Sequence, residues 1–273
     1  MKVQSATQLI FSLSIPSQRW VAWLLFLLIF VATLYGVLIG IDFGTHWDER
    51  RQYDALVKSV ESGVLLPHEY NYPSVLYWLS LASVYDRVFE MLLTIRNHFS
   101  DSWYRPGVSY GEPLPKLEVL SFKFFLMRAR TLAAIVCALG GLWLFLALIK
   151  SRIVSNRLSA VVAAGCYLGS WEFGYHARWV APDMIMGQFV ALFLLFLVKA
   201  ETSKNPQAWL NAASFAVGLA AGTKYLTAAL LIPLWIYTLM RFGREYRVSF
   251  CRSVSASDDR DHHVPPYHAW LSH

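Results

Sequence analysis

The chain has 273 residues, of which 56% are hydrophobic and only 15% are charged. This composition excludes an ordinary soluble domain, in which about a quarter of the residues are charged. The formal net charge of +6 does not indicate nucleic-acid binding, because the basic residues lie mostly beside the apolar runs, where the positive-inside rule places them.

The first apolar run, residues 20–41, contains no charged residue. A signal-peptide core has about 7–15 apolar residues and a spanning helix needs about 20, so we predict a retained first span. Lys2 and Arg19 precede this run and favour a cytoplasmic N-terminus. Asp42 then lies on the extracytoplasmic side.

A long outer loop, residues 42–116, follows, and its first part predicts an amphipathic helix over about 46–62. The apolar residues repeat at helical spacing, at Tyr53, Leu56, Val57 and Val60. Thr45 and Asp48 have the spacing of a capping box at the start of this helix.

A second helix is predicted in the loop from about Pro73 to His98. Its apolar part is long enough to span, but it contains Asp86, Arg87 and Glu90. Each charge at mid-bilayer costs about 2.5–3.5 kcal/mol on insertion scales. We therefore predict that this helix also lies in the interface, with its apolar face toward the lipid.

The remaining spans are predicted within residues 117–241, in five apolar runs separated by short polar turns. The basic turns face the cytoplasm if the chain crosses six times with both ends inside. The predicted fold is thus an all-α integral membrane protein, with one module over residues 1–248. Residues 249–273 show no helical period and read as a disordered or aberrant tail.

Eight ionisable residues stand at membrane borders on the predicted outer face. They are Asp48, Glu49, Arg128, Arg130, His176, Arg178, Asp183 and Lys224. Such groups are costly at a membrane edge unless they are paired or solvated, so their gathering on one face suggests a functional site. A carboxylate can take a proton from an attacking hydroxyl, and a guanidinium can hold phosphate oxygens.

Each of these residues also has a structural interpretation. Asp48 and Glu49 could favour a helix N-terminus by about 0.3–1 kcal/mol. Long basic side chains at span ends commonly reach toward lipid headgroups, which applies to Arg128, Arg130 and Lys224. Asp183 could cap a helix that starts after Pro182 and pair with Arg178, and His176 could simply be interfacial.

Five stretches, in this order, resemble the membrane-embedded C-type glycosyltransferases, in particular the protein O-mannosyltransferases and the lipid A aminoarabinose transferases. They are HWDERRQY, NYPSVLYWL, FLMRARTLAAIVCALGG, YHARWVAPDMIMGQF and GLAAGTKYLTAALLIP. The resemblance covers about residues 20–245. It departs from the family at Pro73, where relatives have two prolines. Relatives are also longer, so this chain would correspond to an N-terminal portion.

The resemblance implies transfer of a sugar from a polyprenyl- or dolichyl-phosphate carrier to an acceptor hydroxyl on a protein or an envelope glycolipid. The reaction would invert the anomeric carbon at the extracytoplasmic membrane face. Asp48 would be the general base with Glu49 beside it, and either Arg128 or Arg130 would bind the phosphate. The supporting polar groups would be His176, Arg178, Asp183 and Lys224.

No cofactor is required by this scheme, although some relatives use a divalent metal, for which the sequence offers no dedicated ligand set. Two other functions stay open. A transporter would carry charges near mid-membrane and an internal repeat, and neither is evident in the sequence. A non-catalytic assembly protein would not depend on Asp48.

Overall fold

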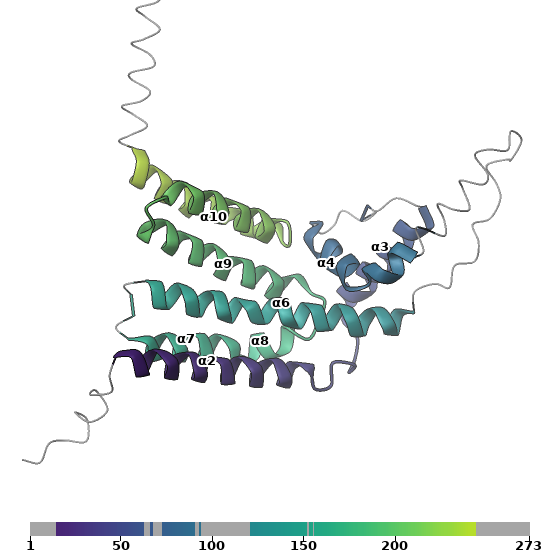
Figure 1. Ribbon diagram of the computed structural model, residues 1–273. Helices are drawn as coiled ribbons and strands as arrows, with labels where there is room; N and C mark the ends of the chain where they lie inside the picture. The colour runs from purple at the N-terminus through teal and green to yellow at the C-terminus, as the bar shows by residue number, and fades with distance from the viewer. Residues whose placement is uncertain are drawn as a thin grey trace, which may run out of the picture. The chain divides into compact units, whose positions relative to one another are not determined.

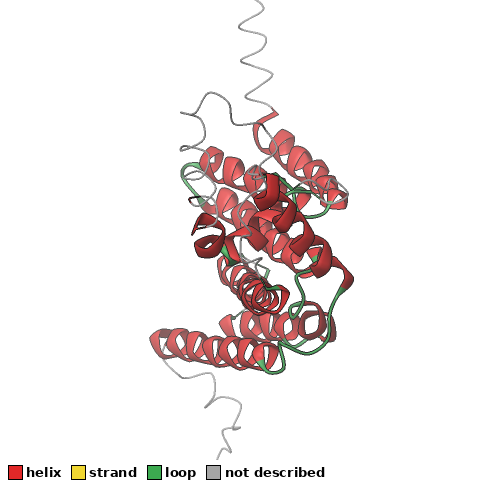
Figure 2. Ribbon diagram, turned by 90° about the vertical axis from the view of Figure 1, so that its right-hand side faces the viewer, coloured by secondary structure: helices red, strands yellow, loops and turns green. Residues whose placement is uncertain are grey.

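The computed structural model describes residues 15–62, 66–67, 73–90, 93, 121–151, 153–154 and 156–243. Every regular element in these ranges is a helix, as Figures 1 and 2 show. The predicted all-α class is confirmed. The chain divides into two units, Met1–Ala228 and Ala229–His273, and the elements that form the site all belong to the first.

Four helices of the described residues are long and apolar enough to cross a membrane. They lie in Arg19–Leu38, Phe122–Lys150, Pro182–Thr202 and Tyr225–Gly243, the last of which begins as the 3-10 helix η1 (Tyr225–Leu230). Two of the other apolar runs form shorter helices, α7 (Arg157–Leu168) and α10 (Pro206–Ala221). The six-span topology stays a prediction.

The first span ends earlier than the sequence predicted. Helix α2 (Ile15–Leu38) stops three residues before the expected end at residue 41. Gly40 follows it with a φ of +67°, a left-handed conformation that ends helices readily and that glycine adopts without a steric penalty. Gly44, with a φ of +66°, then turns the chain toward the next helix.

Local signals explain where several helices begin. The side chains of Asn156, Ser170 and Asn205 accept hydrogen bonds from the first-turn N–H groups of α7, α8 (Trp171–His176) and α10. Proline occupies the first turn of both α9 (Pro182–Thr202) and α10. It is well suited to that position, because its missing N–H would have no partner within the helix.

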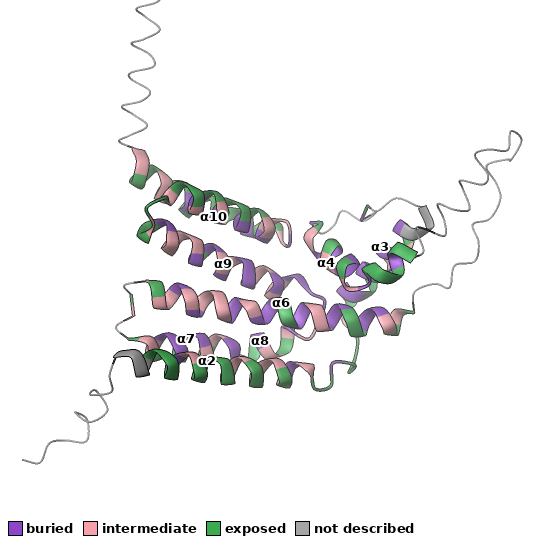
Figure 3. Cartoon of the chain, viewed as in Figure 1, coloured by how far each residue is buried: buried purple, intermediate pink, exposed green. Residues whose placement is uncertain are grey.

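The long helix α6 (Phe122–Lys150) packs against α2, α4, α7 and α9, and α9 packs in turn against α10 (Figure 1). Two glycines of α6 allow close approach: a Cβ on Gly141 would lie 2.5 Å from Leu168 Cγ, and one on Gly140 would lie 2.6 Å from the Tyr167 hydroxyl. Many residues of α2 are exposed (Figure 3), and most of these have large apolar side chains, as expected for a surface that lipid covers.

Helix α6 begins at Phe122, nine residues before Thr131, where the uncharged apolar run 131–149 starts in the sequence. At 1.5 Å per residue this adds about 13 Å of helix. The loop helices α3 (Trp47–Ser62) and α4 (Val75–Ser83) both pack on α6. Helix α6 therefore connects the outer loop to the helices that pack around it.

The first loop helix is confirmed, since α3 matches the expected range 46–62 closely. The second is interrupted, because α4 ends at Ser83 and helix resumes only over 85–90. The backbone N–H of Val75 donates to the carbonyl of Gly222 at 2.8 Å, which ties α4 to the end of α10. Residues 101–116, at the end of the predicted outer loop, and the predicted tail 249–273 lie outside the described residues.

Candidate active site

Glu49 and Arg130 form a buried ion pair that joins α3 to α6. The guanidinium donates from Nε to Oε1 and from Nη2 to Oε2 of the carboxylate, at 2.7 Å in both cases. Both residues are fully buried, with 0% of their surface exposed. Two parallel charge-assisted hydrogen bonds are strong and fix the orientation of both groups. The start of α3 is therefore held against α6.

The other N–H groups of Arg130 bind the backbone between α2 and α3. Nη1 donates to the carbonyls of Ile41 and Phe43, and Nη2 donates to that of Gly44 at 2.8 Å. All five guanidinium donors thus have acceptors. The guanidinium also lies 4.7 Å from the ring centroid of Trp179, within the range of a cation–π interaction.

Glu49 accepts two further hydrogen bonds, which connect it to two more parts of the chain. Its Oε1 accepts from the backbone N–H of Val180 at 3.2 Å, in the turn after α8. Its Oε2 accepts from the backbone N–H of His46 at 2.8 Å, as the third helical residue of a capping box does. The predicted capping box at Thr45 and Asp48 is therefore wrong by one residue.

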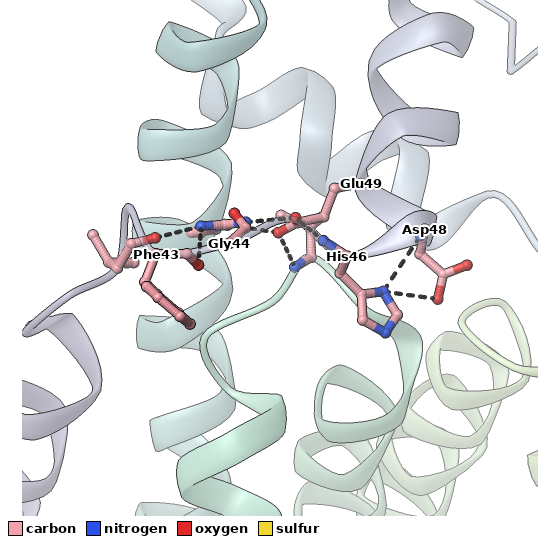
Figure 4. A network of polar contacts seen from close by, with 8 residues as sticks. Phe43, Gly44, His46, Asp48 and Glu49 are labelled. Carbon is pink, nitrogen blue, oxygen red and sulfur yellow. Dashed lines mark hydrogen bonds and ion pairs between the residues drawn. The ribbon is translucent and has the colours of Figure 1, made fainter.

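The other acid of the predicted pair, Asp48, points away from the Glu49 carboxylate (Figure 4). Adjacent side chains on a helix point about 100° apart, so the two acids have different surroundings. Asp48 is buried, with 3% of its surface exposed. Its Oδ2 lies 3.6 Å from Nδ1 of His46, and that nitrogen also accepts the Asp48 backbone N–H at 3.3 Å.

The two arginines of the predicted phosphate site lie on different faces of α6, because two residues turn a helix by about 200°. Arg128 is exposed, pairs with Asp86 of helix 85–90, and lies 4.6 Å from the ring centroid of Phe124. Partial removal from water raises the pKa of Asp86, but the Arg128 hydrogen bond and charge outweigh this, and the pKa is lowered.

A groove of about 460 Å³ adjoins Arg128 between the loop and α6. Most of its lining is apolar or weakly polar, and Arg128 is the charged member. The other lining residues are Ala82, Ser83, Met127, Thr131, Leu132 and Ile135. The groove therefore combines a surface suited to a hydrocarbon chain with one guanidinium.

The four predicted supporting residues separate into a pair and two single contacts. Lys224 and Asp183 form a half-exposed ion pair between the end of α10 and the start of α9. Arg178 donates from Nη2 to the carbonyl of Gly36 at 3.1 Å, which ties the turn after α8 to α2. His176 ends α8, and its ring meets that of Tyr175 edge to face. The structure thus pairs Asp183 with Lys224, and not with Arg178 as the alternative interpretation of the sequence allowed.

Sequence reasoning missed three residues that the structure brings into these contacts: His46, Trp179 and Asp86. His46 and Trp179 lie within the quoted stretches, but nothing in their spacing showed that the two rings would meet 5.9 Å apart. In the sequence, Asp86 served only as evidence that its helix does not span the membrane, and not as a site residue. No group of three or more metal-ligating side chains occurs among the described residues.

Residues 119–253 match the family model of the dolichyl-phosphate-mannose-protein mannosyltransferases. This match confirms the family resemblance. It covers just under half of the chain and includes Arg128 and Arg130, whereas Asp48 and Glu49 lie before it. Comparison with curated proteins and with solved structures finds no match. Together with the four apolar helices, the mannosyltransferase match supports an integral membrane protein.

Proposed function

We propose that this chain transfers a sugar from a dolichyl- or polyprenyl-phosphate carrier to an acceptor hydroxyl at the extracytoplasmic membrane face. The mannosyltransferase match supports the donor class and suggests mannose as the sugar and a protein as the acceptor. One observation carries the choice of base. The Glu49–Arg130 ion pair fixes the first turn of α3, and with it the adjacent Asp48 carboxylate.

In the proposed reaction, Asp48 accepts the proton of the acceptor hydroxyl while the hydroxyl oxygen attacks the anomeric carbon. The bond from this carbon to the phosphate oxygen breaks, and its electron pair leaves with the lipid phosphate. Attack from the face opposite the leaving group inverts the anomeric configuration. A single carboxylate is sufficient for this displacement, and no covalent sugar–enzyme intermediate forms.

Arg128 is the better candidate of the two arginines for the donor phosphate. All five N–H groups of Arg130 already have acceptors inside the protein. Within the described part of the chain, Arg128 forms an ion pair with Asp86 alone, and it adjoins the groove, which would receive the first isoprene units of the carrier. Its guanidinium would offset the charge that develops on the phosphate, so the scheme requires no metal ion.

The remaining predicted residues would have supporting roles. Lys224 is a half-exposed cation, and Asp183 fixes its position. Arg178 and His176 would hold the turn after α8, whose Val180 N–H binds Glu49. Glu49 itself would position the base without accepting the proton.

Asp48→Asn tests the base, because it keeps the shape of the side chain and removes the proton acceptor. The loss of a general base typically lowers the rate by about 10²–10⁴-fold. Transfer of labelled mannose from dolichyl-phosphate-mannose to a serine- and threonine-rich peptide would be measured in vesicles that carry the full chain. The matched control replaces Asp54, an acid on the same helix α3 whose side chain is partly exposed. Asp54→Asn should transfer sugar at the wild-type rate.

The comparison also separates an enzyme from an assembly protein. If Asp48→Asn transfers sugar as fast as the wild type, Asp48 is not the base. Thermal melting of each variant distinguishes lost chemistry from lost folding. An Asp48→Asn protein that melts normally but transfers slowly supports the proposed role.

Arg128→Lys tests the phosphate site, since lysine keeps the charge but loses the planar pair of donors. We expect a KM for dolichyl-phosphate-mannose about tenfold higher, because one good hydrogen bond to a charged group contributes about 1.5–3 kcal/mol. Lys224→Arg is the comparison at the half-exposed cation between α9 and α10. If Arg128→Lys leaves both kcat and KM unchanged, the phosphate binds elsewhere.

A further inference from the structure

His46, the residue before α3, contacts both the backbone and the carboxylate of Asp48 (Figure 4). Its ring Nδ1 accepts the backbone N–H of Asp48 at 3.3 Å and lies 3.6 Å from Oδ2 of the same residue. Tryptophan rings flank the imidazole, with centroid distances of 5.7 Å to Trp47 and 5.9 Å to Trp179. Nδ1 of His46 therefore lies close to both the backbone N–H and the carboxylate of Asp48, the proposed base.

These two contacts require opposite protonation states of Nδ1. A nitrogen that accepts the backbone N–H carries a lone pair and no proton, so it cannot donate to the carboxylate. A proton on Nδ1 would break this helix-capping bond and create a charge-assisted hydrogen bond to Oδ2. That bond would occupy the carboxylate and make it a weaker proton acceptor.

The charged groups around the imidazole come from two helices. Asp48 and Glu49 of α3 place carboxylates near it, and Glu49 also accepts the His46 backbone N–H. Arg130 of α6 lies on the ring of Trp179, and its positive charge is matched by Glu49. The residue that faces the ring from the turn after α8 is Trp179, which is neutral.

We infer that His46 is a positioning residue for Asp48, and that only its neutral form leaves the carboxylate available as the base. In the neutral form, Nδ1 caps α3 and keeps the first turn in register. When the imidazole is protonated, Nδ1–H turns to Oδ2 and sugar transfer stops. This inference rests on the proposed role of Asp48, and it makes the acid limit of activity a property of His46.

His46→Asn tests the inference through the pH dependence of kcat. Asparagine is a strong N-cap residue, so its side-chain oxygen can accept the same backbone N–H, but it does not titrate. We expect nearly wild-type transfer above neutral pH and an acid limb displaced downward by about one pH unit or more, since aspartate titrates well below histidine. His46→Ala, which removes the cap, should be slower at every pH.

Coincident acid limbs in the wild type and His46→Asn would overturn the inference. So would an Asn variant that melts normally but is slow at every pH. His46→Ser, another strong N-cap, replaces the Asn variant if the latter does not fold. The Ser variant has the same expected and contrary outcomes.

A second measurement does not depend on sugar transfer and so separates this inference from the proposed function. The ¹⁵N chemical shifts of the labelled His46 ring should show a bare Nδ1 at neutral pH and protonation in acid. In Asp48→Asn the midpoint of this titration should fall, because the carboxylate that favours the imidazolium is gone. A protonated Nδ1 at neutral pH, or an unchanged midpoint, would contradict the inference even if transfer were never observed.

Discussion

Arg130 shows how one residue can connect several segments that are distant in sequence. It lies in the helix that the match to the mannosyltransferases covers, and it binds the backbone after α2 as well as the first turn of α3. A fully buried guanidinium is stable only when charge and hydrogen bonds compensate for its desolvation. Glu49 provides the opposite charge, so the two side chains depend on each other.

Removal of either partner should therefore destabilise the protein strongly. Glu49→Gln and Arg130→Met each leave one buried charge without its counter-charge, at a cost of about 3–5 kcal/mol. The double variant should lose less than the sum of the two. Arg50→Ala, which breaks the exposed pair with Asp54, is the control and should cost at most about 1 kcal/mol.

Thermal unfolding in detergent would measure all four variants. Additive losses in the double variant would show that the two side chains are not energetically coupled. The structure also corrects the expectation that Glu49 contributes only the small stabilisation of an exposed charge at a helix end. That estimate applies to a solvated carboxylate, whereas Glu49 is 0% exposed and accepts four hydrogen bonds.

At the scale of elements, close helix approach depends on glycines that face neighbouring side chains. A Cβ on Gly141 of α6 would lie within 2.8 Å of three atoms of Leu168, at the end of α7. We expect Gly141→Ala to destabilise the protein by about 1–3 kcal/mol, the usual cost of overpacking. Gly218→Ala on α10 is the control, because nothing lies within 4 Å of its added Cβ.

A melting temperature that falls for Gly141→Ala and not for Gly218→Ala would support this packing. Equal melting temperatures would contradict it. Both substitutions improve intrinsic helix propensity, so a difference between them reports on the neighbours of each glycine.

Sequence patterns predicted those elements whose signal is local. The apolar spacing around Tyr53 gave the bounds of α3, and uninterrupted apolar length gave α2 and the body of α6. The choice between Arg128 and Arg130 could not be made in this way. It depends on which guanidinium has its donors occupied inside the protein, and the Glu49 contact that occupies Arg130 joins residues 81 positions apart in the sequence.

At the scale of the whole molecule, we predict that α8 and the α9–α10 turn lie on opposite sides of the membrane, because the candidate span α9 separates them. The positive-inside rule assigns α8 to the outside and the Lys199–Lys204 region to the inside. A cysteine at exposed Glu172 should therefore react with an impermeant thiol reagent added outside intact cells. A cysteine at exposed Lys204 should react only after permeabilisation.

The three native cysteines, Cys137, Cys166 and Cys251, would first be replaced by serine so that each variant carries one thiol. Reaction of Lys204→Cys in intact cells, with Glu172→Cys protected, would reverse the topology. The proposed site would then face the cytoplasm.

The hydrogen bond from Val75 to Gly222 has a consequence for biosynthesis. A ribosome adds about 5–20 residues per second, so the roughly 150 residues between these two positions take roughly 7 to 30 seconds to make. During that time α4 is already synthesised, but its Val75 N–H has no Gly222 carbonyl to bind. The nascent loop therefore forms this last contact only after α10 has been made, although α4 can pack on α3 and α6 earlier.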